Sequence, residues 1–489
     1  MIGNPICKED LSKYTNGGFL AEEDAQRSKR FVCFDVNRLC DVVADISGTS
    51  TQPVLTIEKM EGGFSKALLM KRVDGSEYIV KIPCPNAGRP RYCTASEVAV
   101  LDFVRKQTTI PVPRVLAWNA NSTNPVGAEY IVMERVPGVQ LFRKWEELGE
   151  SRRISFIKRL TQWKYELSAI CFPAFGNLYH KSSLKGHESI SLNRSVDPEG
   201  VFCIGPSYAT WPVQGSPGMD YGPWETINGL GESLTNRSLQ SVQNLDLELP
   251  ASIRGTAEEY SLAINMAKEI LPAPTLWHTD LHMGNIFVAE DDPSKQARWP
   301  VFLTPPEDYQ EGTVLPRLPP NYEDMDDDEK ELARYNKRKA TWSKAYEIAT
   351  YLNNRKAWQA MHVPEPLKEF RRCGTTSDEG IVPLRETLLE IVRSQDDLGF
   401  EGGSLPIRFT SEQIAHHTKE LDTYRELHDI RGCVKEILDT DDDGWVPPER
   451  DLGEVKARNQ MLFGYYVSKM GTERAPDEIR NMWPFPSDL

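Results

Sequence analysis

The sequence lacks the features that would indicate a metal-bound ribbon, a disulfide scaffold or a membrane-spanning protein. Its nine cysteines include no CxxC pair, so neither a zinc ribbon nor a disulfide framework is indicated, and a reducing compartment fits best. No run of about 18 apolar residues is present, which argues against a transmembrane helix. Acidic residues outnumber basic ones, 72 to 57, and the formal net charge is -15. Sequence-independent binding to nucleic-acid phosphates is therefore not expected.

Apolar residues are sufficient for sizeable cores, since they make up 39% of the 489 residues. Residues 1–52 are expected to form a small helical extension, and their beginning has neither the apolar core of a secretory signal nor the Arg-rich, acid-poor character of a transit peptide. Residues 53–137 contain short runs of alternating polar and apolar residues, separated by turn residues, which is the pattern of a small antiparallel sheet. The chain from 138 to 489 is mainly helical in pattern, with an insertion around 201–231.

The region 53–137 predicts five strands and one helix. Asp74 and Gly75 mark a turn, and Pro137 with Gly138 ends the last strand. The helix is expected to begin with Thr94 as N-cap, with Glu97 three residues later in the position of a capping box. The expected strands cover 54–60, 67–73, 78–82, 110–119 and 128–138, the helix covers 94–107, and a second expected helix covers 329–361.

The stretch LWHTDLHMGNIFV, residues 276–288, carries the clearest chemical signal. His278, Asp280 and Asn285 stand as H-x-D-x-x-x-x-N, the spacing of a kinase catalytic loop. In such a loop the carboxylate accepts the proton of the substrate hydroxyl, and the amide oxygen holds the magnesium ion that neutralises the nucleotide phosphates. A turn organised by the polar side chains is the plainer alternative.

Two upstream residues occupy the places that a kinase-like reaction requires. Lys81 lies in the third predicted strand, where a phosphate-contacting lysine belongs, and Glu97 opens the following helix, where its ion-pair partner belongs. Taken singly, Lys81 is an ordinary edge-strand lysine and Glu97 a capping-box residue. Gly62 and Gly63 would form the phosphate-facing turn. Taken together with the downstream motif, these residues favour the kinase-like interpretation.

The chain resembles fungal aminoglycoside-phosphotransferase-like proteins, particularly the altered-inheritance-of-mitochondria family. The segments that carry this resemblance are KIPCPNAGRPRYCTASEVAVLDFVR, NPVGAEYIVMERVPG and LWHTDLHMGNIFV. It implies an α+β fold of protein-kinase-like type, with a small antiparallel β-sheet N-lobe carrying one helix and a large, mainly helical C-lobe. It also implies transfer of the ATP γ-phosphate to a hydroxyl acceptor that the sequence does not identify. Residence in the mitochondrion is implied by the family alone, with the cytoplasm as the alternative.

The resemblance assigns roles to individual residues. His278 and Asp280 would lie in the catalytic loop, with Asp280 as the base, and Asn285 would be a magnesium ligand. Lys81 would contact the phosphates and Glu97 would be its partner. The backbone groups of Glu134 and Val136 would meet adenine at the hinge.

The chain departs from the family pattern after the catalytic loop. The family has a second strand ending in an Ile-Asp-Trp-like triplet whose aspartate binds magnesium, whereas IFVAEDDPSK here leads directly to QARWPVFL. Two functions therefore stay open: an active phosphotransferase and a catalytically silent ATP-binding pseudokinase or scaffold. Three causes are open: an incorrectly spliced gene model, an isoform without activity, or a protein whose site closes differently. The first is favoured, because loss of an internal strand leaves its neighbour unpaired.

Three further patterns allow other interpretations. DTDDDGWVPPER, residues 439–450, imitates a calcium loop but has Arg450 where a bidentate Glu is required, so an acidic interhelical turn is favoured. A hydrolase metal site built on His278, Asp280 and His282 lacks a second histidine-rich cluster. Trp211, Tyr221 and Trp224 favour packing of an insertion over lining of an acceptor pocket.

Overall fold

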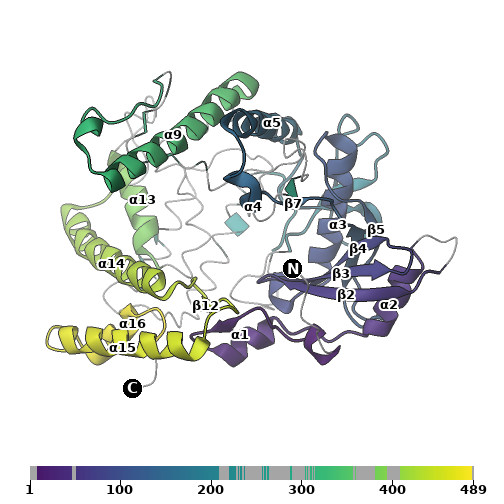
Figure 1. The fold of residues 1–489 in the computed structure, drawn as a ribbon, viewed down its shortest axis with the longest axis horizontal. Coiled ribbons are helices and arrows are strands. Elements are labelled where there is room, and N and C mark those ends of the chain that lie inside the picture. Colours follow the sequence, from purple (N-terminus) through teal and green to yellow (C-terminus); the bar gives the residue numbers. More distant parts are fainter. Residues whose placement is uncertain are drawn as a thin grey trace.

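The computed structural model describes residues 8–46, 51–208, 220–226, 314–355, 380–393 and 408–486, together with short stretches between 229 and 312 and position 358. His278, Asp280 and Asn285 lie outside the described residues, as do Trp211 and the acidic residues 290–292. Figure 1 shows the arrangement of the described elements.

The predicted small sheet is confirmed as five antiparallel strands in the order β2-β3-β4-β6-β5. The strands β5 and β6 are shorter than expected; Pro111 and Pro113 lie before β5, and proline cannot donate a hydrogen bond to a ladder. The strands are β2 (Val54–Glu61), β3 (Ser65–Arg72), β4 (Glu77–Pro83), β5 (Val115–Asn119) and β6 (Tyr130–Glu134).

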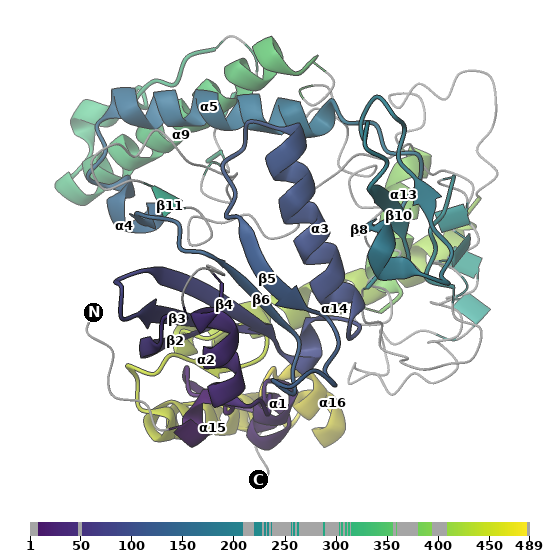
Figure 2. The ribbon, with the colours of Figure 1, turned by 90° about the vertical axis from the view of Figure 1, so that its right-hand side faces the viewer.

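The two faces of this sheet have different neighbours, because side chains alternate along each strand. Leu68, Met70, Val80 and Ile82 are fully buried on one face, where they pack against residues of the N-terminal segment such as Leu39. The other face carries Lys81 and packs partly against helix α3 (Tyr92–Gln107), as Figure 2 shows.

The start of α3 differs from the prediction. The N-cap is Arg91, with a φ of 70°, and Thr94 lies inside the first turn. The Thr94 hydroxyl donates to Glu129 at 2.6 Å, so it does not cap the helix, and Glu97 is engaged by Lys81 instead of closing a capping box. Tertiary partners have overridden the local capping signal at this helix.

A second sheet lies against the outer side of α3. Its order is β8-β10-β9, formed by β8 (Asn177–His180), β9 (Ile190–Ser191) and β10 (Phe202–Gly205). The predicted insertion thus begins on the central strand of this sheet. Trp224 is buried and donates from Nε1 to Asp220 at 2.6 Å, and Tyr221 stacks on Arg89. Both aromatic side chains pack within this region, as the sequence favours.

The rest of the described chain is mainly helical, which confirms the predicted α+β, kinase-like two-lobed class. The predicted long helix is α9 (Asp327–Asn353); it begins at a capping box between Asp326 and Glu329 and ends earlier than expected. It packs along α5 around Trp145, Phe156 and Trp342. The other helices are α4 (Leu141–Trp145), α5 (Glu150–Ser168), α13 (Val382–Arg393), α14 (Ser411–Leu438), α15 (Leu452–Met470) and α16 (Pro476–Met482).

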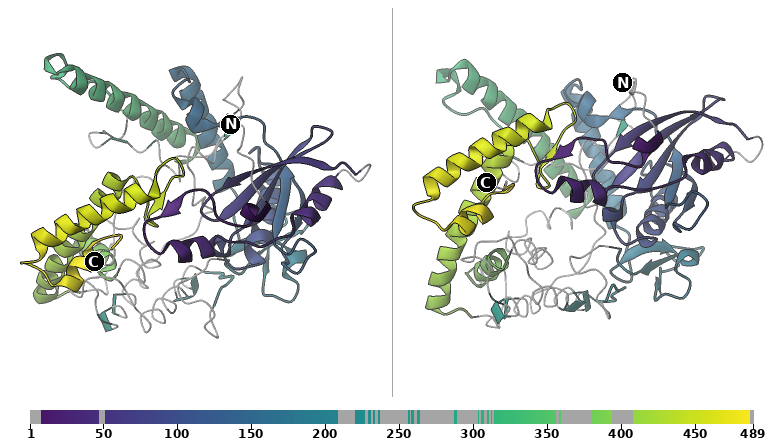
Figure 3. Two further views of the ribbon diagram at one scale, coloured as in Figure 1. Left: turned by 60° about the horizontal axis from the view of Figure 1, so that its bottom comes forward. Right: turned by 90° about the horizontal axis from the view of Figure 1, so that it is seen from below.

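The N-terminal segment bridges the five-stranded sheet and the C-terminal helices, as the views in Figures 1 and 3 agree. Its strand β1 (Gly18–Phe19) pairs with β12 (Trp445–Val446), which lies between α14 and α15. Its helices are α1 (Glu23–Lys29) and α2 (Val36–Ala44). None of the helices in the described part of the chain is long and apolar enough to cross a lipid bilayer.

Candidate functional site

Lys81 and Glu97 form an ion pair on the face of the sheet that α3 covers. The Lys81 Nζ donates to both carboxylate oxygens of Glu97, at 2.7 and 2.8 Å. Val80 and Ile82 are buried on the opposite face, so the strand geometry forces the intervening lysine toward α3. Both partners keep about a third of their side chain exposed. The pair therefore stands at the rim of the covered region, where a ligand can reach the ammonium group.

Helix α3 is held on two sides, which fixes the position of Glu97. On the sheet side, Val98 packs with Ile131 and Met133. On the outer side, Asp102 accepts a hydrogen bond from His180 of β8 at 2.9 Å. Burial by itself would raise the pKa of Asp102, but the hydrogen bonds from His180 and Lys106 outweigh it and hold that pKa below its ordinary value.

The cysteine one turn before Glu97 is not an activated nucleophile. Burial raises the pKa of Cys93 to about 11, and the negative charge of Glu97 adds to the effect. A thiol needs its thiolate form for nucleophilic attack. The chemistry of this region therefore rests on charge and hydrogen bonding.

Gly62 and Gly63 form the turn between β2 and β3. The N–H of Gly62 donates to the Ser65 carbonyl at 3.1 Å, and the Gly63 carbonyl accepts from the Asn86 side chain at 3.0 Å. Neither glycine has a positive φ, and a Cβ on Gly63 would meet nothing within 4 Å. Neither the backbone conformation nor crowding within the described residues therefore requires glycine at 63. Because no described atom lies near such a Cβ, the turn has open space beside Gly63.

The predicted hinge is the end of β6 and the residues that follow it. The Glu134 N–H donates to the Arg114 carbonyl at 3.0 Å, and the Glu134 carboxylate accepts from the Arg114 N–H at 3.0 Å. The N–H of Glu134 is thus already bonded to Arg114, just before β5. The carbonyl oxygen of Glu134 is the backbone group left for the predicted contact with adenine. Val136 is half-buried beyond the strand end.

The end of the H-x-D-x-x-x-x-N segment lies beside this hinge. Strand β11 (Phe287–Val288), the last two residues of that segment, pairs antiparallel with β7 (Val139–Gln140), which follows β6. His278, Asp280 and Asn285 themselves lie outside the described residues. The pairing nevertheless places the end of their segment next to the strand that leads out of the small sheet.

The acidic loop 439–450 connects α14 to α15, as the sequence favours, and its carboxylates do not converge on one point. Asp442 contacts Lys435, and Asp443 binds Arg30 at 2.7 Å. In the described ranges of the chain, no group of three His, Cys, Asp or Glu side chains could hold a metal ion.

A residue that the sequence analysis did not single out is Glu61, directly before Gly62. Its side chain is 2% exposed and forms ion pairs with Lys59 at 2.9 Å and Lys66 at 2.8 Å. The signal was present: these charges are in phase with Ile57, Leu68 and Met70, so strand alternation assigns them to the buried face. Charged residues in phase with a buried face need partners there.

The sequence profile of the Phosphotransferase enzyme family matches residues 56–295, the region that contains the small sheet, the Lys81–Glu97 pair and the H-x-D-x-x-x-x-N segment. The chain contains a phosphotransferase family domain. The recognition made from the motifs is thereby confirmed, and relatives named for altered inheritance of mitochondria are found as well.

Two relatives are similar to most of this chain. A subtelomeric hrmA-associated cluster protein of Aspergillus fumigatus is 26% identical over 468 residues, which are 82% of this chain and 91% of the relative. Altered inheritance of mitochondria protein 9, mitochondrial, of Yarrowia lipolytica is 23% identical over 526 residues, covering 94% and 88% of the two chains.

Solved structures similar to this chain include a streptomycin–ATP complex of APH(2")-IIa, at 13% identity and a TM-score of 0.36, covering 75% of this chain and 99% of that one. A GDP complex of aminoglycoside 2'-phosphotransferase-IIIa has 12% identity and a TM-score of 0.33, and covers 79% and 98%.

Proposed function

We propose that this kinase-like phosphotransferase binds ATP with magnesium and transfers the γ-phosphate to a hydroxyl acceptor. The observation that carries the proposal is the Lys81–Glu97 ion pair, 2.7 Å long, on an open part of the sheet face. A lysine fixed by a carboxylate can meet nucleotide phosphates as a point charge without searching among rotamers. The open space before Gly63 is consistent with phosphates approaching the turn.

The roles of the remaining residues follow from their places in the chain. Asp280 would accept the proton of the acceptor hydroxyl, with His278 in the same loop. The carbonyl of Glu134 and the N–H of Val136 would hold adenine, and Gly62 with Gly63 would face the phosphates. When bound, magnesium would neutralise charge on the phosphates, with Asn285 as a ligand.

A catalytically silent, ATP-binding pseudokinase or scaffold is the second candidate. It is favoured by one observation in the sequence, the direct passage from IFVAEDDPSK to QARWPVFL without an aspartate-bearing triplet of the family type. A single amide ligand holds magnesium poorly, because this ion prefers octahedral oxygen coordination with carboxylates. The family domain favours both candidates over a His–Asp metal hydrolase.

The deciding experiment is a thermal shift with ATP, in the presence and absence of magnesium. ATP at about 100 times its dissociation constant should stabilise the folded chain by about 2.7 kcal/mol. For an active phosphotransferase, the shift depends on magnesium and is lost in Lys81→Ala, while Asp280→Asn keeps binding and loses phosphate transfer. Binding that is indifferent to magnesium favours the pseudokinase, and absence of binding refutes both.

The relatives support a proposal for the compartment at modest identity. The Yarrowia lipolytica relative is named as mitochondrial, so we propose the mitochondrion for this chain, with the cytoplasm as the alternative. Fractionation of cells that express the full chain with a C-terminal tag distinguishes the two. Recovery of the tag only in the cytosolic fraction would reject the mitochondrial assignment.

A further inference from the structure

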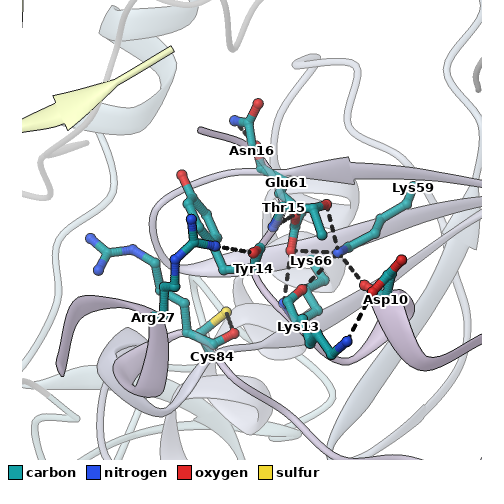
Figure 4. Close-up of polar contacts among 11 residues, drawn as sticks. Asp10, Lys13, Tyr14, Thr15, Asn16, Arg27, Lys59, Glu61, Lys66 and Cys84 are labelled. Carbon is teal, nitrogen blue, oxygen red and sulfur yellow. Dashed lines mark hydrogen bonds and ion pairs between the residues drawn. The ribbon is translucent and has the colours of Figure 1, made fainter. Parts of the chain in front are cut away.

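A buried ionic cluster lies on the face of the sheet opposite Lys81, and Glu61 is at its centre (Figure 4). The Oε1 atom of Glu61 contacts the ammonium groups of Lys59 at 2.9 Å and Lys66 at 2.8 Å. Its Oε2 atom accepts hydrogen bonds from the N–H and the hydroxyl of Thr15, at 2.7 and 2.8 Å. Four donors therefore fix one carboxylate.

The partners of Glu61 favour its carboxylate form, although the cluster is almost completely covered. The side chains of Lys59, Glu61 and Lys66 are 3%, 2% and 0% exposed. Burial by itself would raise the pKa of Glu61, but the hydrogen bonds from Lys66, Lys59 and Thr15 outweigh it and lower that pKa. Apolar side chains of similar volume often fill such a space with equal or better stability. The charged groups instead provide directional hydrogen bonds, and these fix the position of Glu61.

Glu61 is joined directly to the glycine turn. It is the last residue of β2, and its backbone carbonyl accepts a hydrogen bond from the Asn16 side chain at 3.0 Å. The far side of the turn is fixed by the Cys84 N–H, which donates to the Phe64 carbonyl at 2.9 Å. The entry to the turn is therefore held by the N-terminal segment, and its exit by the sheet.

The same N-terminal residues are joined to the C-terminal helices. The indole N–H of Trp445 in β12 donates to the Asn16 carbonyl at 2.6 Å. Gly17 has a φ of 95°, and a Cβ there would lie 2.2 Å from the Val446 carbonyl. Asp10–Phe19, which we call the N-terminal strap, thus runs in direct contact from the glycine turn to β12.

We propose that Glu61 is a positioning residue for the glycine turn. The N-terminal strap fixes Glu61, and β12 fixes the strap, so the C-terminal helices set where Gly62 and Gly63 stand. The inference rests on the proposed function, because the turn faces phosphates only if the site binds ATP. The inference adds a structural connection between the glycine turn, on the phosphate side of the site, and β12 with the C-terminal helices.

The first test compares two ligands that share adenine and differ in phosphates. Dissociation constants of the full chain for magnesium–ATP and for adenosine are measured by calorimetry for wild type, Thr15→Val and Glu61→Gln. Loss of one well-placed phosphate contact corresponds to roughly a tenfold weaker binding of ATP, whereas adenosine binding should stay within about twofold. Thr15→Ser, which keeps the hydroxyl, should restore ATP binding. Equal weakening of both ligands, or none, overturns the inference.

The second test needs no nucleotide. Hydrogen–deuterium exchange of residues 60–66 is compared between Trp445→Phe, which loses the bond to Asn16, and Trp483→Phe. The matched control loses an equivalent indole bond, to Asn459 at 2.9 Å, away from the strap. We expect faster exchange only in Trp445→Phe; unchanged exchange overturns the inference.

The two proposals fail in distinguishable ways. If wild type binds no ATP, the proposed function fails and the role of Glu61 with it, whatever the exchange shows. If wild type binds magnesium–ATP but the strap variants do not separate ATP from adenosine, only the inference fails.

Discussion

The small sheet carries two lysine–glutamate pairs on its opposite faces, and they should respond very differently to the same substitution. The side chains of Lys81 and Glu97 are each about one third exposed, whereas those of Lys66 and Glu61 are 0% and 2% exposed. The changes are Glu97→Gln and Glu61→Gln, which keep side-chain size and remove one charge. The matched control is Glu58→Gln, on the same strand as Glu61 at an exposed position.

The expected magnitudes follow from exposure. A solvent-accessible ion pair contributes about 0–1 kcal/mol to the free energy of unfolding, because water screens it. Removing one partner of a buried pair costs about 3–5 kcal/mol, because the other charge stays buried without its counter-charge. Glu61→Gln leaves both Lys59 and Lys66 in that condition. The two variants should therefore differ by at least about 2 kcal/mol, with the control within about 0.5 kcal/mol of wild type.

Urea unfolding, followed by circular dichroism with the midpoint and the slope fitted separately, measures these differences. The affinity for ATP, measured on the same samples, should not follow the unfolding free energy. Glu97→Gln should weaken ATP binding with little loss of stability, because it releases Lys81. An unfolding free energy that falls equally in both glutamate variants would refute the link between exposure and magnitude. So would a Glu61→Gln variant as stable as the control.

Three further predictions concern other parts of the molecule. Burial lowers the pKa of His417, and the carboxylate of Glu386 offsets this only in part. The stability that the neutral imidazole contributes is therefore present above pH 6.5 and lost as the pH falls through the folded-state pKa. His417→Gln should remove this pH dependence of the unfolding free energy, measured by urea unfolding at a series of pH values. Gly17→Ala should lower the melting temperature, because its Cβ would lie 2.2 Å from a β12 carbonyl at a positive φ, whereas Gly63→Ala should leave it nearly unchanged and weaken ATP binding instead. Calcium at millimolar concentration should leave the melting temperature unchanged, since carboxylates of the loop 439–450 pair with Arg30 and Lys435; stabilisation by calcium would contradict this assignment.

The strands of the small sheet could be predicted because their signal is local. Alternation along β2, β3 and β4, with Asp74 and Gly75 at a turn, specifies both the strands and their faces. The same alternation made Lys81 face α3, where it pairs with Glu97. The phosphotransferase recognition rests on a motif of nearby residues, which is also local.

Local signals failed where a tertiary partner competed for the same group. Thr94 and Glu97 have the spacing of a capping box, but Glu129 takes the hydroxyl and Lys81 takes the carboxylate. The Glu129 carboxylate gives the Thr94 hydroxyl a charge-assisted hydrogen bond, which is stronger than a neutral cap bond from a backbone N–H. The Lys81 ammonium gives the Glu97 carboxylate a partner of opposite charge. The N-cap consequently lies at Arg91, three residues before the Thr94 that the cap signal indicated.

The sequence by itself determined the secondary structure of the small sheet, its pairing of Lys81 with Glu97 and the presence of a phosphotransferase family domain. The tertiary structure alone decided that Asn16 meets Trp445 and Arg30 meets Asp443, contacts that join residues more than 400 positions apart. Neither contact has a local pattern, because hydrogen bonds and ion pairs between distant segments depend on how whole elements pack. The environment of Glu61, directly before the glycine turn, is set by that packing.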